Sequence, residues 1–387
     1  DANEKDIITT SNTIAKSYLG DNTDNNLINI FTNLGSSYYK YKKEFKNNSS
    51  IKNYSDFHGN RDFYHLIKYT SIKIKELLVK NKSIEKEFLT DIELKSMEKN
   101  FGGLITYENK YKTGFNIICK KLSEYNDEIK NIYEKNIGVD VKEKIINNLI
   151  EPTFDYLSRY LLLITKSNIG IYLLNSFLKS IKYDSNYTIF IGSVFLDDIQ
   201  KEEYSSKILS KIKMNMEKDI ILILKDMDSI YPSLYDLFNQ NFVKVKGKKY
   251  ARIALGSKTN SFSEVNDKFR CIIIVDEDRL YEQEIPFLNR FEKQNLSFEY
   301  LMTKEQINIS HNLYIKCQKM IQYDENKYGL INYDINNLLI NCDEEEIKGI
   351  IFMEGQNIKD NNKNNEEYFE NKLISKISLT LPQDIIL

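Results

Sequence analysis

The sequence predicts a helical unit followed by an α/β domain, in which helices flank a parallel β-sheet. Up to about residue 103, apolar residues recur every three to four positions, as in amphipathic helices. Between about 155 and 305, short apolar runs alternate with helical patterns, as in βαβ units. A chain of 387 residues also exceeds the size at which one core stops growing, so at least two structural units are expected.

The helical unit is predicted over residues 1–103. A polar stretch rich in Asn and Ser interrupts its apolar periodicity as a loop. The last helix ends at Gly102 and Gly103, which form a helix-stop signal. The predicted helices lie within 5–47, from about Asn60 to Lys80, and over about 83–100.

A charged, helix-prone connector over 104–154 precedes the α/β domain of 155–305. The apolar runs of that domain lack alternation, which is typical of strands buried on both faces of a parallel sheet. Residues 306–387 are predicted to be a helical and irregular C-terminal segment, with a helix around 304–322 and a polar linker at about 356–371. The four predicted strands are 159–165, 187–193, 219–224 and 269–276.

Composition argues against several classes of function. A net charge of −2 gives no electrostatic case for binding nucleic acid or a membrane surface. No run of about 18 apolar residues is present, so we expect no transmembrane segment and a cytoplasmic location. The chain begins without Met, and we expect it to be a fragment. No zinc or general-base spacing is seen among the cysteines (Cys119, Cys271, Cys317, Cys342) and histidines (His58, His65, His311).

The turn after the first strand, TKSNIGIY, lies where nucleotide-binding α/β domains carry the phosphate loop G-x-x-x-x-G-K-[ST]. That loop needs glycines to curl its backbone around phosphate, a lysine for the phosphates and a hydroxyl for magnesium. The loop here, with Lys166, Ser167 and Gly170, has one glycine, and Lys166 is on the wrong side of it. We predict a degenerate loop that no longer cradles phosphate; the alternative is weak anion binding at the helix N-terminus.

The third predicted strand ends in Lys225-Asp226, where an ATPase would carry Asp-Glu to hold magnesium and polarise water. A lysine at the magnesium-ligand place would repel the metal, so this pair is a degenerate Walker-B-like site. Asp226, Asp228 and Asp236 remain as carboxylates, whose ordinary role is a solvated strand end and helix face. The alternative is an active ATPase with divergent motifs, with Lys166 on phosphate and Asp226 and Asp228 on magnesium.

The stretch FRCIIIVDEDRLYEQEIPFLNRFEK is more specific. A buried strand ends at Asp276, and a loop leads through Pro286 to Asn289 and Arg290, which open a helix-like pattern. An arginine in such a loop is usually a surface residue or half of a salt bridge. The order of strand, loop, proline and Asn-Arg nevertheless resembles AAA+ ATPases. In that layout Asp276 would be sensor-1-like, and Asn289 and Arg290 arginine-finger-like.

Four stretches together resemble the mysterin family, giant RING-type ubiquitin ligases with a dynein-like core of concatenated AAA+ modules. The similarity runs with gaps to about residue 322. SLYDLFNQNF, followed by a Gly-Lys-Lys-Tyr hairpin, is its most specific part. The stretches are NRDFYHLIK at 60–68, SRYLLLITKSNIG at 158–170, and residues 226–257 and 269–296.

The resemblance implies that residues 1–103 are the helical lid of a preceding AAA+ module, and that residues 155–305 are the degenerate large domain of the next. Arg61 would match the second-sensor arginine that reaches the nucleotide of the upstream module. The alternative for Arg61 is an ion pair with Asp62 or Glu76. No cofactor is expected in this segment, because ATP and magnesium would bind in the neighbouring module of the parent protein.

The implied function is a non-hydrolysing segment that couples the nucleotide state of a neighbouring ATPase module to the shape of the ligase, by biasing the angle between lid and large domain. The implied partners are adjacent AAA+ modules of the same chain, with the ubiquitin-conjugating enzyme and substrates bound by other parts of the parent protein. No nucleic acid partner is expected. A further alternative is a protein-binding scaffold with no nucleotide role, which would contact its partners through YPSLYDLFNQNF.

Overall fold

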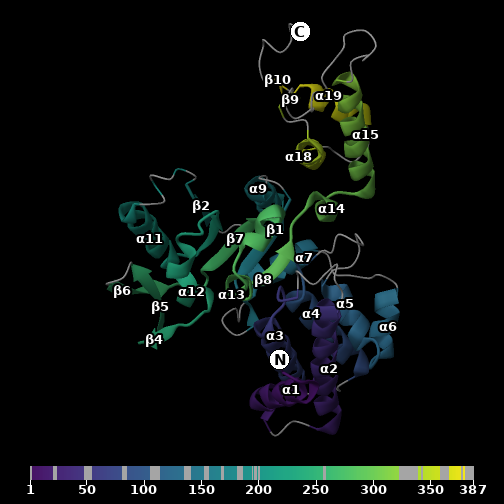
Figure 1. Ribbon diagram of the computed structural model, residues 1–387, viewed down its shortest axis with the longest axis vertical. Coiled ribbons are helices and arrows are strands. Elements are labelled where there is room, and N and C mark those ends of the chain that lie inside the picture. The colour runs from purple at the N-terminus through teal and green to yellow at the C-terminus, as the bar shows by residue number, and fades with distance from the viewer. Residues whose placement is uncertain are drawn as a thin grey trace. The chain divides into compact units, whose positions relative to one another are not determined.

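A computed structural model of the chain divides into two compact units, each described here by itself (Figure 1). Unit 1 comprises Asp1–Ile164, Ser185–Val275 and Arg279–Asn295, and unit 2 comprises Thr165–Asp184, Asp276–Asp278 and Leu296–Leu387. The structure describes residues 2–20, 24–47, 55–80, 85–104, 114–134, 141–151, 157–166, 170–180, 186–193, 195, 198, 201–255, 259–321, 339–340, 343–357, 366–375 and 378–379.

The helical part of unit 1 begins with local capping. Asn3 and Asp6 form a capping box, in which the backbone N–H of Asp6 donates to Oδ1 of Asn3 at 2.9 Å. Gly20 ends the first helix with a φ of 64°, a conformation that favours glycine. The helices are α1 (Glu4–Leu19), α2 (Asn25–Asn47), α3 (Asn60–Val79), α4 (Lys86–Asn100), α5 (Gly114–Leu122), α6 (Asp127–Glu134) and α7 (Val141–Ile150).

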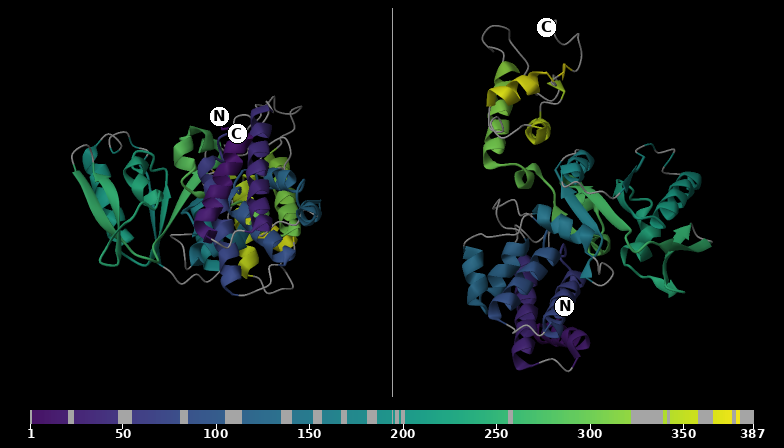
Figure 2. Two further views of the ribbon diagram at one scale, coloured as in Figure 1. Left: turned by 90° about the horizontal axis from the view of Figure 1, so that it is seen from below. Right: turned by 180° about the vertical axis from the view of Figure 1, so that it is seen from behind.

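Aromatic rings fill the core of these helices, and α1, α2 and α3 lie side by side (Figures 1 and 2). Tyr38 stacks on Phe63 with ring centroids 4.5 Å apart, and Tyr41 meets Phe101 edge-on at 5.2 Å. The three helical stretches predicted before Gly103 are all present. Leu122 of α5 is buried in the same core, so this packing continues past Gly103. The predicted domain boundaries stay predictions.

The sheet of unit 1 contains the four strands that the sequence predicted and one that it did not. Its order is β2-β3-β7-β1-β8, and β1 with β8, β2 with β3, and β3 with β7 pair in parallel. The prediction that Asn289 and Arg290 open a helix was wrong, because the short helix α13 (Ile285–Leu288) ends before them and β8 follows. The strands are β1 (Leu161–Thr165), β2 (Asn186–Ile191), β3 (Ile220–Lys225), β7 (Arg270–Asp276) and β8 (Glu292–Asn295).

The burial of each strand and the polarity of its residues explain which strands could be predicted from the sequence. Every residue of β3 and β7 is buried, and apart from Lys225, Arg270 and Asp276 at their ends both strands are continuous apolar runs. Every residue of β8 is buried too, although its sequence is EKQN. The helix α11 (Glu202–Met216) packs on β3, while α4 and α7 pack on β8. The predicted α/β class, with a parallel sheet flanked by helices, is confirmed.

A small antiparallel sheet, β4-β5-β6, lies between β3 and β7 in the sequence. Its first hairpin turns at Lys246 and Gly247, whose φ angles are 50° and 80°. A two-residue turn with both φ angles positive matches the twist of the flanking strands. The elements of this region are η3 (Tyr231–Leu234), α12 (Tyr235–Phe238), β4 (Val243–Val245), β5 (Lys248–Leu255), β6 (Thr259–Val265) and η4 (Glu277–Glu282).

The motif that includes α12 belongs to the core. Tyr231, Leu237 and Phe238 are buried, and the ring of Phe238 meets that of Phe291 with centroids 5.0 Å apart. The scaffold alternative assigned partner contact to the aromatic surface of YPSLYDLFNQNF. Tyr231 and Phe238 are buried and unavailable to a partner, which corrects that part of the alternative, whereas Tyr235 and Phe242 are only partly buried.

Unit 2 joins helices from distant parts of the sequence. Oγ of Ser176 donates a hydrogen bond to the sulfur of Met353 at 3.0 Å. The helix predicted around 304–322 is present as α15. Of the predicted linker at about 356–371, residues 358–365 lie outside the described residues, and helices flank them. The elements are α9 (Gly170–Ser180), α14 (Phe298–Leu301), α15 (Lys304–Ile321), β9 (Leu339–Ile340), α18 (Glu344–Asn357), α19 (Glu366–Ile374) and β10 (Ser378–Leu379).

Within the described part of the chain, no helix combines the length and the hydrophobicity that crossing a membrane requires.

Candidate functional site

Arg279 holds the two carboxylates that follow β3. Its Nη1 lies 2.5 Å from Oδ1 of Asp226, and its Nη2 lies 3.0 Å from Oδ2 of Asp228. Gln283 adds a donor, with Nε2 3.1 Å from Oδ1 of Asp228. Hydrogen bonding to Glu282 and the charges of Asp226 and Asp228 raise the pKa of Arg279. Asp226 and Asp228 are the carboxylates that the divergent-ATPase alternative assigns to magnesium. In the structure the guanidinium group of Arg279 neutralises their charge instead.

The end of β3 is enclosed by backbone. Lys225 is 4% exposed, and its carbonyl oxygen accepts a hydrogen bond from the backbone N–H of Gly192 at 2.9 Å. A Cβ atom added to Gly192 would lie 1.6 Å from the carbonyl oxygen of Asp226, so only glycine fits beside this turn. Asp226 adopts a φ of 55°, a left-handed conformation that Asp tolerates better than most residues.

The predicted degenerate phosphate loop lies partly outside the described residues. Lys166 is exposed at the end of β1, Ser167 is not described, and Gly170 begins α9. In unit 2, Oγ1 of Thr165 donates a hydrogen bond to Oδ1 of Asp276 at 3.2 Å. The sensor-1-like carboxylate is thus buried and bonded to a hydroxyl of its own unit.

A buried carboxylate, Asp62, joins α3 to the sheet of unit 1. Nη1 of Arg159 lies 2.8 Å from Oδ1 of Asp62, and Nζ of Lys293 lies 2.9 and 3.1 Å from its two oxygens. Asp62 is 0% exposed and Lys293 is 1% exposed. Burial lowers the pKa of Lys293 to about 8. Burial raises the pKa of Asp62, but Lys293 and Arg159 outweigh this effect and bring that pKa below its ordinary value.

The polar side chains of β8 receive further partners from the helices. Oε2 of Glu292 lies 3.3 Å from Nζ of Lys99 and accepts a hydrogen bond from Nδ2 of Asn148 at 2.6 Å. We call Asp62, Lys99, Arg159, Glu292 and Lys293 the polar seam. Lys99 is partly buried and the other four charges are buried, but all are paired, so none carries the full cost of an isolated buried ion.

Glycines allow close approach along the polar seam. A Cβ atom on Gly102 would lie 2.6 Å from Oε1 of Gln294 and 2.7 Å from the carbonyl oxygen of Lys293. A Cβ atom on Gly59 would lie 2.5 Å from Nδ2 of Asn289. The backbone N–H of Gly59 also lies 3.3 Å from Oδ1 of Asn289, so Asn289 contacts the start of α3.

Arg61 and Arg290 both contact the α12 region. The guanidinium of Arg290 lies over the ring of Tyr235, 3.8 Å from its centroid, and Arg61 donates a hydrogen bond to Oδ1 of Asn239. The backbone N–H of Asn239 donates to the carbonyl oxygen of Tyr235 at 2.9 Å, so these two contact points are one helical turn apart. Burial, followed by the charge of Arg61, lowers the pKa of Arg290.

The alternative ion pair for Arg61 does not form in the structure. Asp62 is bonded to Arg159 and Lys293, and Glu76 lies 3.2 Å from Nζ of Lys73. Arg61 is exposed, and its charge is therefore available at the surface beside Arg290.

Comparison with known proteins agrees with this geometry. Residues 151–302 match the family model described as RNF213 AAA domain. Over this stretch the chain is similar to the RNF213 AAA domain, and we call the stretch the RNF213-type segment. The match confirms the resemblance to the mysterin family, and the five-stranded parallel sheet of the RNF213-type segment is consistent with an AAA+ fold.

Curated relatives extend the similarity of the RNF213-type segment. The chain is 29% identical over 250 residues to the E3 ubiquitin-protein ligase rnf213-beta of Danio rerio, covering 62% of this chain and 4% of the relative. It is 32% identical over 167 residues to RNF213 of Homo sapiens (42% and 3%) and 27% identical over 267 residues to RNF213 of Mus musculus (67% and 5%). The chain thus spans 3% to 5% of the length of these ligases.

Sequence reasoning missed the residues that hold the RNF213-type segment to its helices. Asp62 is three residues after Gly59 at the start of a helix, a position typical of a capping carboxylate. Arg159 precedes an apolar strand and Lys293 lies in a polar run, and neither position carries a periodic signal. Arg279 follows a buried strand, which is a weak indication of a role at the sheet edge.

Proposed function

We propose that this chain is a non-hydrolysing AAA+ segment of an RNF213-like protein, and that it couples the nucleotide state of the preceding module to the shape of the parent. In this proposal Arg61 and Arg290 reach together towards the nucleotide of that upstream module. The observation that carries the proposal is the convergence of these two arginines on α12, although 229 positions separate them in the sequence.

The chemistry of the arginine pair supports a phosphate ligand. Guanidinium groups form bidentate contacts with phosphate oxygens, and two of them side by side repel each other until an anion binds between them. A phosphate group bound between the two guanidinium groups would relieve this repulsion.

The absence of hydrolysis by this segment is proposed from Arg279. Asp226 and Asp228 are the carboxylates on which the divergent-ATPase alternative places magnesium, and Arg279 is bonded to both. Binding a metal there would require displacing a guanidinium and leaving its charge beside the metal. We propose that ATP and magnesium bind in the neighbouring module, and not in this segment.

The polar seam refines the proposed coupling. A hinge between the helices and the sheet would have to break the ion pairs of the polar seam. Breaking a buried ion pair leaves a buried charge without its partner, which costs several kcal/mol. We propose that the helical lid and the sheet of unit 1 move together, so that a change at Arg61 and Arg290 reorients unit 1 as a body. The angle that responds to nucleotide would then lie between this chain and the upstream module.

Partners and location are proposed from the relatives, which are named E3 ubiquitin-protein ligases. The adjacent AAA+ modules of the same chain would be the direct partners. A ubiquitin-conjugating enzyme and the substrates would bind other parts of the parent protein, in the cytoplasm.

The coupling proposal is tested in a longer version of the chain that includes the preceding module. Arg61→Ala and Arg290→Ala should each weaken ATP binding by at least about tenfold, the effect of one lost charged hydrogen bond. Lys268→Ala, which removes an exposed cation (77% side-chain exposure) from a different surface, is the control. Unchanged ATP affinity in both arginine variants would refute the role of the pair.

The claim of no hydrolysis is tested separately on this chain. Calorimetry with ATP and magnesium should detect no binding, and a phosphate-release assay should detect no turnover. Micromolar binding that weakens in Lys166→Ala would favour the divergent ATPase.

A further inference from the structure

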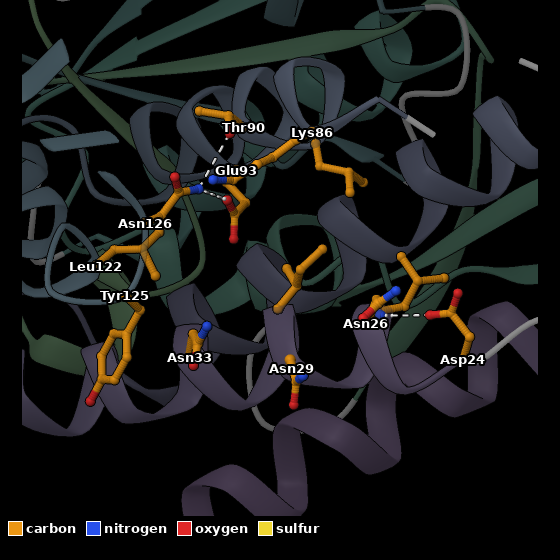
Figure 3. Close-up of a pocket in the computed structure, with 13 residues that line it drawn as sticks. Asp24, Asn26, Asn29, Asn33, Lys86, Thr90, Glu93, Leu122, Tyr125 and Asn126 are labelled. Carbon is orange, nitrogen blue, oxygen red and sulfur yellow. Dashed lines mark hydrogen bonds between the residues drawn. The ribbon is translucent and has the colours of Figure 1, made fainter. Parts of the chain in front are cut away.

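A cavity of about 530 Å³ lies among the helices of unit 1, between α2, α4 and the α5–α6 turn. Figure 3 shows side chains from these elements around it. Its size is within the range of pockets that hold small ligands. It is formed by residues other than Asp226, Arg279, Arg61, Arg290 and the polar seam, so it is separate from the site proposed above.

One wall of the cavity carries a buried carboxylate. Glu93 is 4% exposed, and its Oε2 accepts a hydrogen bond from Nδ2 of Asn126 at 3.1 Å. Its other oxygen, Oε1, has no hydrogen bond or ion pair within the described residues. In Figure 3 the carboxyl group of Glu93 points into the space between α4 and α2. Oε1 does not belong to the buried side-chain atoms that lack a partner within the described residues, so it is accessible from the cavity and can accept a donor from a ligand or water.

The other side chains that line the cavity indicate what kind of hydrogen-bond donor could bind Oε1 of Glu93. Leu27, Ile30, Leu89 and Leu122 give the cavity apolar walls. The α2 side chains that line it include no charged group. Within the described residues no cluster of three His, Cys, Asp or Glu side chains able to hold a metal exists, so the geometry does not favour a metal ion. Asp24, Lys86, Thr90, Tyr125 and four asparagines complete the lining, so the cavity combines an apolar side with a polar one. An alkyl chain that ends in a cation would lie along the apolar side chains and meet the Glu93 carboxylate.

We propose that this cavity binds a primary alkylammonium group, with the ammonium donating to Oε1 of Glu93 and the alkyl chain lying against Leu27, Ile30 and Leu122. The ammonium group comes either from a free alkylamine or from a lysine side chain of a protein segment. Both sources present the same chemistry to the cavity. The inference does not depend on the proposed nucleotide function.

The charged groups around Glu93 make the binding depend on pH. Burial raises the pKa of Glu93 to about 7; Asn126 lowers it by hydrogen bonding, Glu128 of α6 raises it and Lys86 of α4 lowers it. Of the other residues that line the cavity, Asp24 and Tyr125 can also be charged. Only the ionised carboxylate attracts an ammonium group.

The experiment titrates the whole chain with n-butylammonium chloride, using ligand-observed NMR at pH 8. n-Butanol, which has the same alkyl chain without the charge, tests the role of the cation. Glu93→Gln keeps the size and the bond to Asn126 but removes the charge. Glu87→Gln, on the exposed face of the same helix, is the matched control. Thermal unfolding of each variant verifies that it is folded.

The expected result is binding of n-butylammonium that Glu93→Gln weakens by at least about tenfold and that Glu87→Gln leaves unchanged. The affinity should also be about tenfold lower at pH 6 than at pH 8, because most Glu93 carboxyls are then protonated. No binding, equal binding by Glu93→Gln, or equal binding of n-butanol would overturn the proposal.

A second titration separates the two sources. A capped Gly-Gly-Lys-Gly-Gly peptide that displaces n-butylammonium would assign the cavity to a lysine side chain. Failure of the peptide, with binding of cadaverine retained, would assign it to a free alkylamine.

Discussion

Nζ of Lys293 lies 2.9 Å from Oδ1 of Asp62, although 231 positions separate the two residues in the sequence. This contact links the start of a helix to a buried polar strand. Arg159, which precedes β1, bonds to the same carboxylate oxygen at 2.8 Å. One carboxylate therefore ties together the three parts of unit 1 that form its junction: α3, the start of β1 and β8.

Asp62→Asn should destabilise the chain by about 3 kcal/mol, because Arg159 and Lys293 would remain buried without a counter-charge. Urea unfolding of the variant measures the loss. Asp91→Asn, which removes an exposed partner of Lys95, should change the free energy of unfolding by no more than about 0.5 kcal/mol. A loss of less than about 1 kcal/mol for Asp62→Asn would contradict this account of the polar seam.

Glu93 should make stability fall as pH rises from about 4.5 to about 7. Its pKa is raised in the folded state, so the folded chain binds more protons than the unfolded chain in this window, and stability is lost as pH rises. Glu93→Gln removes this effect. The advantage of the variant over the wild type in urea unfolding should grow on the order of 3 kcal/mol between pH 4.5 and pH 8. A constant difference across this range would show that the Glu93 pKa is ordinary.

Arg279→Gln should lower the free energy of unfolding by about 1 kcal/mol, because partly exposed ion pairs contribute little individually and Asp226 and Asp228 would be left to repel each other. The same variant removes the guanidinium group from both carboxylates. Terbium luminescence is expected to report binding of a trivalent cation to Arg279→Gln but not to Asp226→Asn/Arg279→Gln. Equal luminescence for these two variants would place the ion elsewhere.

Gly102→Ala should destabilise the chain by about 2 kcal/mol, since the new Cβ would lie 2.7 Å from the carbonyl oxygen of Lys293 and force the helices away from β8. Gly349→Ala is the contrast, because its nearest neighbour is a ring atom of Phe298 at an ordinary 3.4 Å. That helical substitution should be neutral or stabilising by up to about 1 kcal/mol. Calorimetry measures the unfolding temperature of both variants. An equal change in unfolding temperature for the two would argue against a close approach at Gly102.

The strands that sequence analysis found share one physical property. Between their charged ends, β3 and β7 are apolar throughout because both of their faces are covered, so the residues themselves mark the strand. β8 is covered as completely, but its partners are charges and amides from distant helices. A polar strand of this kind has the local appearance of a loop, which is why Glu292 to Asn295 were not predicted as a strand.

As with the strands, only part of the candidate site could be predicted from the sequence: single residues were recognised, but their contacts were not. Arg61 and Arg290 were recognised from motifs, and their roles at a nucleotide stay predictions. Their common contact with α12 depends on the fold, because Asn239 and Tyr235 belong to neither motif. Arg279 could not be assigned to Asp226 and Asp228 in advance, since about 50 residues and a three-stranded insertion separate them. Glu93 has no sequence signal at all, because its burial arises from packing between helices.

The position of β8 at the end of unit 1 sets an order of events during synthesis. Asp62 leaves the ribosome 231 residues before Lys293, and β1 precedes its neighbour β8 by more than a hundred residues. At typical elongation rates this delay is roughly 10 to 50 s, far longer than helix formation requires. The helices must therefore remain in a partly assembled state, in which Asp62 can contact Arg159 but not yet Lys293, until the last strand of unit 1 is synthesised. A nascent chain stalled before residue 292 should remain accessible to chaperones and proteases, while one stalled well after residue 295 should already be protected.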